Sequence, residues 1–171
     1  MKKLFAILVA LVLCLSAGYA ETEEAAVETY LFIVEAVSGE ETVSVEIGVD
    51  QDFAPVLALL GEPVGYFESN SCAFQGLDKV YTYPSFVINT YPQEGADMVS
   101  SIYLMDDMFT TAEGAYIGMS LDEVKAIYGE PTSEADSSVS FVKGPCALAF
   151  LYDADGYITA ITYTSVAASA Q

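Results

Sequence analysis

The chain contains no histidine, no arginine and no tryptophan, and its 171 residues include only five lysines. Without histidine, neither a Ser–His nor a Cys–His pair can form, which excludes the commonest nucleophilic sites of hydrolases. Zinc is excluded as well, because histidine is absent and cysteines number only three. The sequence also lacks a glycine-rich phosphate loop and a basic patch for nucleic acid. We therefore expect no cofactor and no nucleic-acid partner.

The charged residues of the chain are mostly acidic. There are 25 acidic residues, and the formal net charge is −20. Such a surface repels nucleic acid and anionic membranes, and it favours a protein partner with a cationic surface. An acidic surface also keeps an exported protein soluble, so the charge by itself leaves both explanations open.

Residues 1–20, MKKLFAILVALVLCLSAGYA, combine two lysines, an apolar run and small residues at Gly18 and Ala20. This pattern predicts a secretory signal peptide that is cleaved after Ala20, and hence a secreted or cell-surface protein. The run over 4–17 is too short to cross a bilayer comfortably, so no membrane span is expected in the mature chain. A lipoprotein signal acylated at Cys14 is not expected, because the preceding residue is Leu13 rather than a small one.

Two cysteines, Cys72 and Cys146, lie beyond the signal. An oxidising compartment permits a disulfide, and closing a loop of about 75 residues would stabilise the fold by roughly 4 kcal/mol. The alternative is two separate buried thiols, which pack as small apolar groups. We favour the disulfide, although spacing in the sequence does not show proximity.

Residues 21–28, ETEEAAVE, are acidic and without periodicity, and they predict a flexible leader. Residues 29–48 then alternate between apolar and polar, with a turn at SGEE. This pattern is typical of a β-hairpin or of two short strands.

Two related segments follow, IGVDQDFAPVLALLGEP at 47–63 and IGMSLDEVKAIYGEP at 117–131. Each predicts a short helix that ends at a glycine and is stopped by a proline two residues later. In the first, Asp50 or Asp52 can cap the helix, and the apolar stripe comprises Phe53, Val56, Leu57 and Leu60.

In the second segment, Ser120 and Glu123 match a capping box, and Met119 and Val124 match a hydrophobic staple. Both helices are about ten residues long. Since isolated helices of that length are marginal in water, each must pack against a sheet.

Strand patterns follow each helix. After the first helix we expect strands over 65–69, 78–83, 85–92 and 97–105, and after the second over 137–142, 146–152 and 157–164. The expected fold class is α+β, with two repeats of a short helix and an antiparallel β-meander, and helices covering one face of the sheet. The first repeat, with the hairpin, spans 29–108, and the second spans 109–171.

Acidic residues offer two further readings. Asp153 and Asp155 in DADG imitate the start of a calcium loop, but no glutamate stands at the closing position, so a hairpin turn is the better prediction. No metal-binding residue is assigned. Carboxylate pairs for glycoside hydrolysis need a defined separation, and no such constellation is recognisable.

Four tyrosines on the predicted strands are candidates for partner binding: Tyr81, Tyr83, Tyr91 and Tyr103. Alternate strand residues share a face, so Tyr81 and Tyr83 point the same way. A face free of helices that carries tyrosines suits protein contact, because tyrosine offers area with little entropy to lose. The alternative is that these tyrosines are ordinary strand formers.

The same alternation applies to the last strand of the first unit. It predicts that Tyr103 shares the open face with Val99 and Ser101, and that Ile102 and Leu104 point beneath the helix.

The repeated helix with its G-x-P ending, followed by three or four strands, resembles the SmpA/OmlA/BamE-type fold. The tandem form looks like the β-lactamase inhibitor protein family. The segments SCAFQGLDKVYTY, INTYP and TTAEGAYIG resemble parts of small exported proteins of Gram-positive gut bacteria. The resemblance implies a binding scaffold rather than an enzyme: the tandem inhibitor clasps a protein partner with a concave sheet, and the single-repeat family acts in outer-membrane assembly.

The function expected from the sequence is therefore an exported, non-catalytic binding protein that presents an open sheet face to a protein partner. An inhibitor and an envelope-assembly factor are two versions of it. The alternative is an envelope domain that senses a ligand or calcium, and the third reading is a hydrolase that uses carboxylates.

Overall fold

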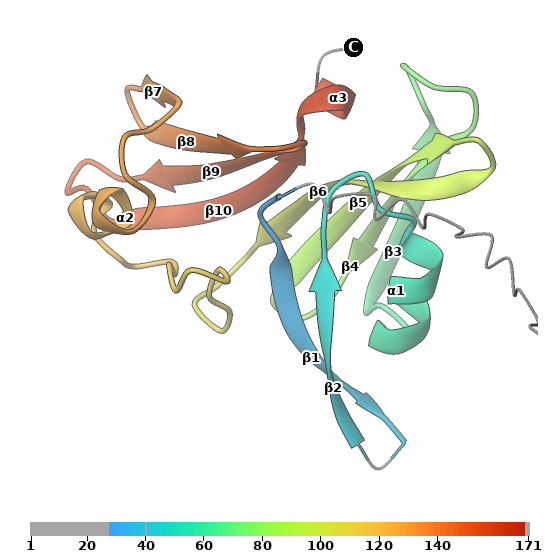
Figure 1. Ribbon diagram of the computed structural model, residues 1–171. Coiled ribbons are helices and arrows are strands. Elements are labelled where there is room, and N and C mark those ends of the chain that lie inside the picture. Colours follow the sequence, from blue (N-terminus) through green and yellow to red (C-terminus); the bar gives the residue numbers. More distant parts are fainter. Residues whose placement is uncertain (1–27, 40, 170–171) are drawn as a thin grey trace, which may run out of the picture.

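The computed structural model describes residues 28–39 and 41–169. The predicted signal peptide and all but the last residue of the predicted leader lie outside this range. The described residues form a two-stranded hairpin, an eight-stranded antiparallel sheet and three short helices, as Figure 1 shows. This composition is that of an α+β fold, as predicted.

The hairpin consists of β1 (Phe32–Ser38) and β2 (Glu41–Ile47), which pair antiparallel with Phe32 opposite Ile47. It confirms the prediction for residues 29–48. Apolar side chains at alternate positions of both strands lie on one face of the hairpin. This face packs against the core, where Phe32 and Ile47 are fully buried.

The large sheet has the strand order β3-β4-β5-β6-β10-β9-β8-β7. Two four-stranded groups, β3–β6 and β7–β10, thus meet where β6 pairs antiparallel with β10, with Ile102 opposite Tyr163 and Leu104 opposite Ile161. The strands are β3 (Gly65–Asn70), β4 (Leu77–Thr82), β5 (Phe86–Gln93), β6 (Ala96–Leu104), β7 (Ser133–Ala135), β8 (Ser138–Lys143), β9 (Cys146–Tyr152) and β10 (Ile158–Ser165).

Seven of these eight strands, all except β7, match the predicted strands to within about one residue at each end. The short strand β7 and the terminal helix α3 (Val166–Ser169) were not predicted. Neither has a periodic pattern long enough to distinguish it from a turn.

Helix α1 (Phe53–Leu60) begins at Asp52, whose carboxylate accepts a hydrogen bond from the Ala54 amide at 3.0 Å. It ends at Gly61, which has a φ of 75°. Since L-residues with a side chain rarely adopt a positive φ, glycine is the residue that fits this position.

Helix α2 (Leu121–Tyr128) has the predicted capping box. The Ser120 amide donates to the Glu123 carboxylate at 3.0 Å, and the Glu123 amide donates to the Ser120 hydroxyl. The helix ends at Gly129, with a φ of 82°. The two short helices therefore begin and end through the local chemistry that the sequence predicts.

The N-cap residue of each helix pairs with the large sheet or with the residue directly before one of its strands. The cap residue Asp52 forms an isolated antiparallel bridge with Met98 on β6, and the cap residue Ser120 forms one with Tyr157, directly before β10. Both helices are thus tied to the two strands that meet in the middle of the sheet.

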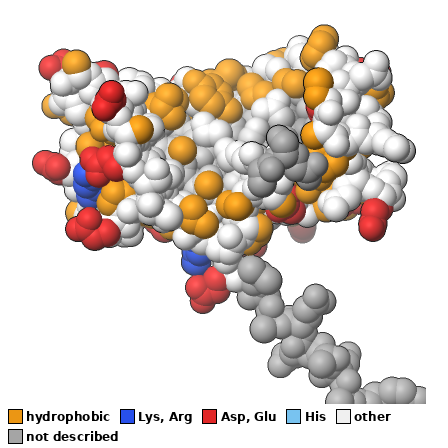
Figure 2. Space-filling model, turned by 90° about the horizontal axis from the view of Figure 1, so that it is seen from above, with side chains coloured by type: hydrophobic (Ala, Val, Ile, Leu, Met, Phe, Trp, Pro, Cys, Tyr) orange, Lys and Arg blue, Asp and Glu red, His pale blue; other side chains and the backbone are white. Residues whose placement is uncertain are grey.

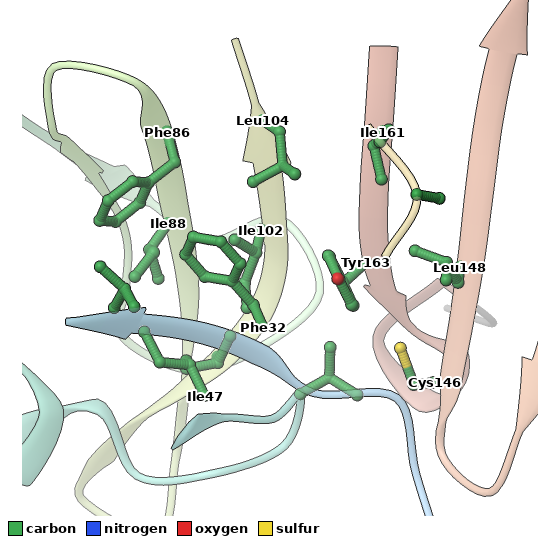
Figure 3. Packing of buried hydrophobic residues seen from close by; sticks show 14 of the residues in the cluster. Phe32, Ile47, Phe86, Ile88, Ile102, Leu104, Cys146, Leu148, Ile161 and Tyr163 are labelled. Atoms are coloured by element: carbon green, nitrogen blue, oxygen red, sulfur yellow. The ribbon is translucent and has the colours of Figure 1, made fainter. Parts of the chain in front are cut away.

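The core lies between the large sheet and the hairpin. Figure 3 shows Phe32 and Ile47 of the hairpin pointing toward side chains of β5 and β6 on one side and of β9 and β10 on the other. The Phe32 ring lies 5.1 Å from the Phe86 ring and 6.1 Å from the Tyr163 ring, measured between centroids. Phe32 therefore links the cores of the two strand groups.

Candidate functional site

The two faces of the large sheet differ in burial. Along the central strands, every second side chain is buried against the hairpin and the helices, including Ile88, Ile102, Leu148 and Phe150. The side chains between them are only partly buried or exposed. We call the face that carries these partly exposed side chains the outer face.

Two rows of cross-strand neighbours run across the middle of the outer face. One row runs Phe67, Val80, Asn89, Ser101, Thr164, Ala147, Val142. The other row runs Thr82, Val87, Tyr103, Thr162, Ala149, Ser140, Ser133. None of these side chains is charged, although the chain carries 25 acidic residues. The two rows are therefore free of charge, and one acid, Asp78, lies beside them on β4, on the same face as Val80.

Figure 2 shows the molecule from above, on the side opposite the hairpin. Uncharged and apolar side chains occupy most of this view, and the acidic side chains lie mainly toward its margins. Small residues and hydroxyl residues predominate in the rows, so the backbone of the sheet is accessible to a broad, smooth partner surface.

One end of the outer face is hollowed. A cavity of about 390 Å³ lies between the β3–β4 loop and α3, with Phe74, Asn89, Ser101 and Ala168 among its lining residues. The Asn89 side-chain amide donates to the Ser101 hydroxyl at 2.8 Å across β5 and β6. The hollow offers the hydrogen-bonding groups of Asn89 and Ser101 beside an aromatic wall, and the charged residues Asp78 and Lys79 also line it.

Tyr103 lies in the middle of the outer face with 40% of its surface exposed. Its neighbours Ile102 and Leu104 are fully buried on the opposite face, as predicted. Val99 was expected to share the face of Tyr103 and is instead fully buried. The reason is a bulge: the pairing register shifts between Asn89 and Thr90, which leaves Ser100 as an extra residue and reverses the alternation before it.

The placement expected for Tyr81 and Tyr83 on the open face is wrong. Both are 6% exposed and lie in the core. The Tyr81 ring packs 4.6 Å from the Phe53 ring of α1, and the Tyr83 hydroxyl donates to the Gly61 carbonyl at 3.1 Å. Burial raises the pKa of both phenols above its usual value. Alternation showed that the two side chains share a face, but only the position of α1 decides which face.

Tyr91 is also 6% exposed, so it is not an open contact residue. Its ring lies 4.6 Å from Phe74 of the β3–β4 loop, and its hydroxyl donates to Asp50 at 2.9 Å. Burial, together with this hydrogen bond to Asp50, raises the pKa of Tyr91 to about 12. Tyr91 thus connects β5 with the β3–β4 loop, through Phe74, and with the segment before α1, through Asp50.

The favoured disulfide is also wrong. Cys72 and Cys146 are both free; Cys72 is exposed in the β3–β4 loop, and Cys146 is buried at the start of β9. Burial raises the pKa of the Cys146 thiol to about 12. The alternative was two separate buried thiols. The two cysteines are separate, but only Cys146 is buried.

The acidic loop at 153–156 is a hairpin turn, as predicted. The Asp153 carboxylate accepts hydrogen bonds at 3.0 Å from the amides of Asp155 and Tyr157, which closes the turn between β9 and β10. Within residues 28–39 and 41–169, no group of three or more potential ligand side chains is placed to hold a metal ion. No helix in the same part of the chain is long and apolar enough to span a bilayer.

Most residues of the outer face were not predicted from the sequence, because the predicted contact residues were all tyrosines. The half of the face on β8, β9 and β10 has instead Ser, Thr, Ala and Val residues between the buried positions of these strands. The available signal was the polar half of the strand alternation in SVSFVK and ITAITYTS, where serine and threonine stand in place of charged residues.

Comparisons of the chain with models of protein families, with curated proteins and with solved structures found no match.

Proposed function

We propose that this chain is an exported, non-catalytic binding protein whose outer face docks a protein partner. The observation that carries the proposal is the absence of charge from both rows of the outer face in a chain with a formal net charge of −20. In an antiparallel sheet with one solvated face, the residues that point to solvent are normally polar or charged. Two uncharged rows framed by acids match the pattern of a contact surface, whose centre is depleted of charge and whose rim is polar.

The proposal includes an internal repeat. Each unit would comprise one short helix and four strands, α1 with β3–β6 and α2 with β7–β10, with the helices on one side of the joined sheet. Three correspondences support this: the glycine that ends each helix, the cap residue that bridges to the last strand of its group or to the residue directly before it, and the mirrored strand order on either side of β6 and β10. Two such units side by side leave a single broad face for one partner.

The partner's rim is proposed to be cationic. Each of the three described lysines lies close to a carboxylate: Lys79 at 2.7 Å from Asp97, Lys125 at 3.0 Å from Glu134, and Lys143 at 3.7 Å from Glu28. The remaining carboxylates therefore set the sign of the surface around the outer face. Electrostatic attraction would speed association, and it would weaken as salt is added.

Inhibition of an extracellular or cell-wall enzyme is one version of this function, following the resemblance of the repeated segments to tandem inhibitors. A catalytic role has little support, because the chain lacks histidine and its buried cysteine is held as a thiol. Calcium sensing gains no support from the Asp153 carboxylate, which is occupied with backbone amides.

The experiment is recovery of partners by the tagged mature chain from an envelope and culture-medium fraction of the producing cell. Three proteins are compared: the unaltered chain, Tyr103→Asp on the outer face and Leu59→Asp on α1. Tyr103 and Leu59 are 40% and 42% exposed, so the two variants add one charge at equally accessible sites. Burying an unpaired charge at an interface costs several kcal/mol.

The proposal predicts that a protein retained by the unaltered chain and by Leu59→Asp is lost from Tyr103→Asp. Equal recovery by all three proteins contradicts docking on the outer face, as does a loss confined to Leu59→Asp. Thermal unfolding of both variants serves as the control for folding.

A further inference from the structure

The sheet has two edges, β7 and β3, and they differ. Edge strands expose unpaired backbone groups, and proteins usually shield them by making them short or charged. The β7 edge follows this rule: it has three residues, and its central Glu134 is bonded to Lys125 of α2. The β3 edge follows it only in part: it carries one charge, Glu68, but it is twice as long and also exposes large apolar side chains.

Strand β3 is six residues long and pairs with β4 alone among the described strands. Two of its side chains are large and exposed, Tyr66 at 53% and Phe67 at 62%. Directly before them, Val64 is 71% exposed. An accessible edge of this length, with large apolar side chains at its start, is a template for an additional strand.

The hydrogen-bond pattern identifies the free backbone groups of this edge. The Ser71 amide donates to the Gly76 carbonyl at 3.0 Å, where the β3–β4 ladder ends. Because ladder bonds alternate along an antiparallel strand, Tyr66, Glu68 and Asn70 direct their amides and carbonyls away from β4. These are the groups that an added strand would pair with.

A second cavity, of about 520 Å³, adjoins the same edge on the side of α1. It is lined mainly by apolar side chains, including Leu57 and Ala58 of α1, Pro63, and the two aromatic rings Tyr66 and Tyr81. The two rings are 5.2 Å apart and form the floor next to the free edge. A strand added to β3 would direct one side chain into this space.

The charges beside the edge are negative. Glu62 lines the cavity, and Glu68 lies on β3 two residues from Tyr66, where it accepts a hydrogen bond from the Tyr66 hydroxyl. The residue opposite Glu68 on β4 is Lys79, which is engaged by Asp97 at 2.7 Å. A basic side chain two residues from the apolar one would therefore lie beside Glu68.

We propose that the β3 edge binds an extended segment of a partner protein by strand addition. The segment places an apolar side chain in the cavity between α1 and β3, and a lysine or arginine two residues away beside Glu68. This site uses the free backbone edge of β3 and its α1 side, and it shares only Phe67 with the outer face. It goes beyond the function proposed above. A second copy of the chain does not fit, because self-pairing would bring Glu62 and Glu68 of two strongly acidic chains together.

The test uses a synthetic probe, the acetylated and amidated peptide Thr-Thr-Lys-Thr-Leu-Thr-Thr, with amide hydrogen exchange of the mature chain as the readout. Addition of the peptide is expected to slow exchange at Tyr66, Glu68 and Asn70. Peptides with serine in place of leucine, or with glutamate in place of lysine, are expected to bind about tenfold more weakly or worse. Unchanged exchange at these three amides at saturating peptide overturns the proposal.

A backbone variant separates strand addition from binding in the cavity alone. Glu68→Pro removes an amide that faces away from β4, and edge strands tolerate proline at such positions. Glu68→Gln removes the charge and keeps the amide. Strand addition predicts that Glu68→Pro binds the peptide at least about tenfold more weakly than Glu68→Gln. Equal affinity of the two variants, with the β3–β4 ladder intact by exchange, contradicts it; neither outcome depends on whether the outer face docks a partner.

Discussion

Tyr103 on β6 lies directly opposite Thr162 on β10, across the line where the two four-stranded groups meet. On the other face of the same two strands, Ile102 lies opposite Tyr163, and both are fully buried. The join between the groups is thus an apolar core on one side and an uncharged surface on the other. Stability and the proposed docking are carried by different side chains of the same strands, which allows them to be tested separately.

Phe32→Ala is expected to lower the free energy of unfolding by about 3–5 kcal/mol, because the ring is fully buried against Phe86 and Tyr163. Phe67→Ala is the matched control, since Phe67 is 62% exposed on β3 and should cost less than about 0.5 kcal/mol. Denaturant unfolding measures both. Similar losses for the two variants would contradict the position of the hairpin in the core.

Tyr163→Phe is expected to stabilise the protein by roughly 1 kcal/mol. The Tyr163 hydroxyl is buried without a hydrogen-bond partner, so its removal relieves a desolvation cost and leaves the ring packing intact. Tyr83→Phe should have the opposite sign, because its hydroxyl donates to the Gly61 carbonyl. Denaturant midpoints that fall in both variants would show that Tyr163 has a partner in solution.

The cysteines are expected to react at very different rates. Cys72 is exposed, whereas Cys146 is buried and its thiol pKa is raised to about 12. Iodoacetamide should modify Cys72 in the native protein and Cys146 only after unfolding, as peptide mass spectrometry can show. Recovery of a peptide that joins the two cysteines under non-reducing conditions would contradict this arrangement.

Stability is expected to fall as the pH rises from 10 to 12, partly through Tyr91. Its native pKa is raised to about 12, by burial and by the hydrogen bond to Asp50, whereas an unfolded tyrosine titrates near 10. The unfolded chain therefore releases this proton first, and the stabilisation that is complete below pH 10 is lost across that interval. Tyr91→Phe should flatten this part of the stability profile; an unaltered slope would contradict the assignment.

The parts of the fold governed by local chemistry were predictable from the sequence. The capping box at Ser120, the glycine ends at Gly61 and Gly129 and the Asp153 turn depend on a few adjacent residues, and all are found as expected. The burial of Tyr81 was not predictable, because strand alternation defines two faces without saying which one a helix will cover.

Two other features were also beyond the sequence. The bulge at Ser100 reverses the alternation within β6, and no residue pattern marks it. The separation of Cys72 from Cys146 depends on the strand order of the completed sheet, in which the two residues belong to different groups. Long-range pairing of this kind is decided by the packing of all strands together.

Photo-crosslinking in the producing cell can show whether the outer face contacts a protein. A photoreactive amino acid is placed at Tyr103 on the outer face or at Ile127 on α2, which are 40% and 38% exposed. If the outer face docks the partner, position 103 forms a covalent adduct with a protein of basic surface and position 127 forms none. Adducts of equal yield from both positions, or from position 127 alone, would contradict it.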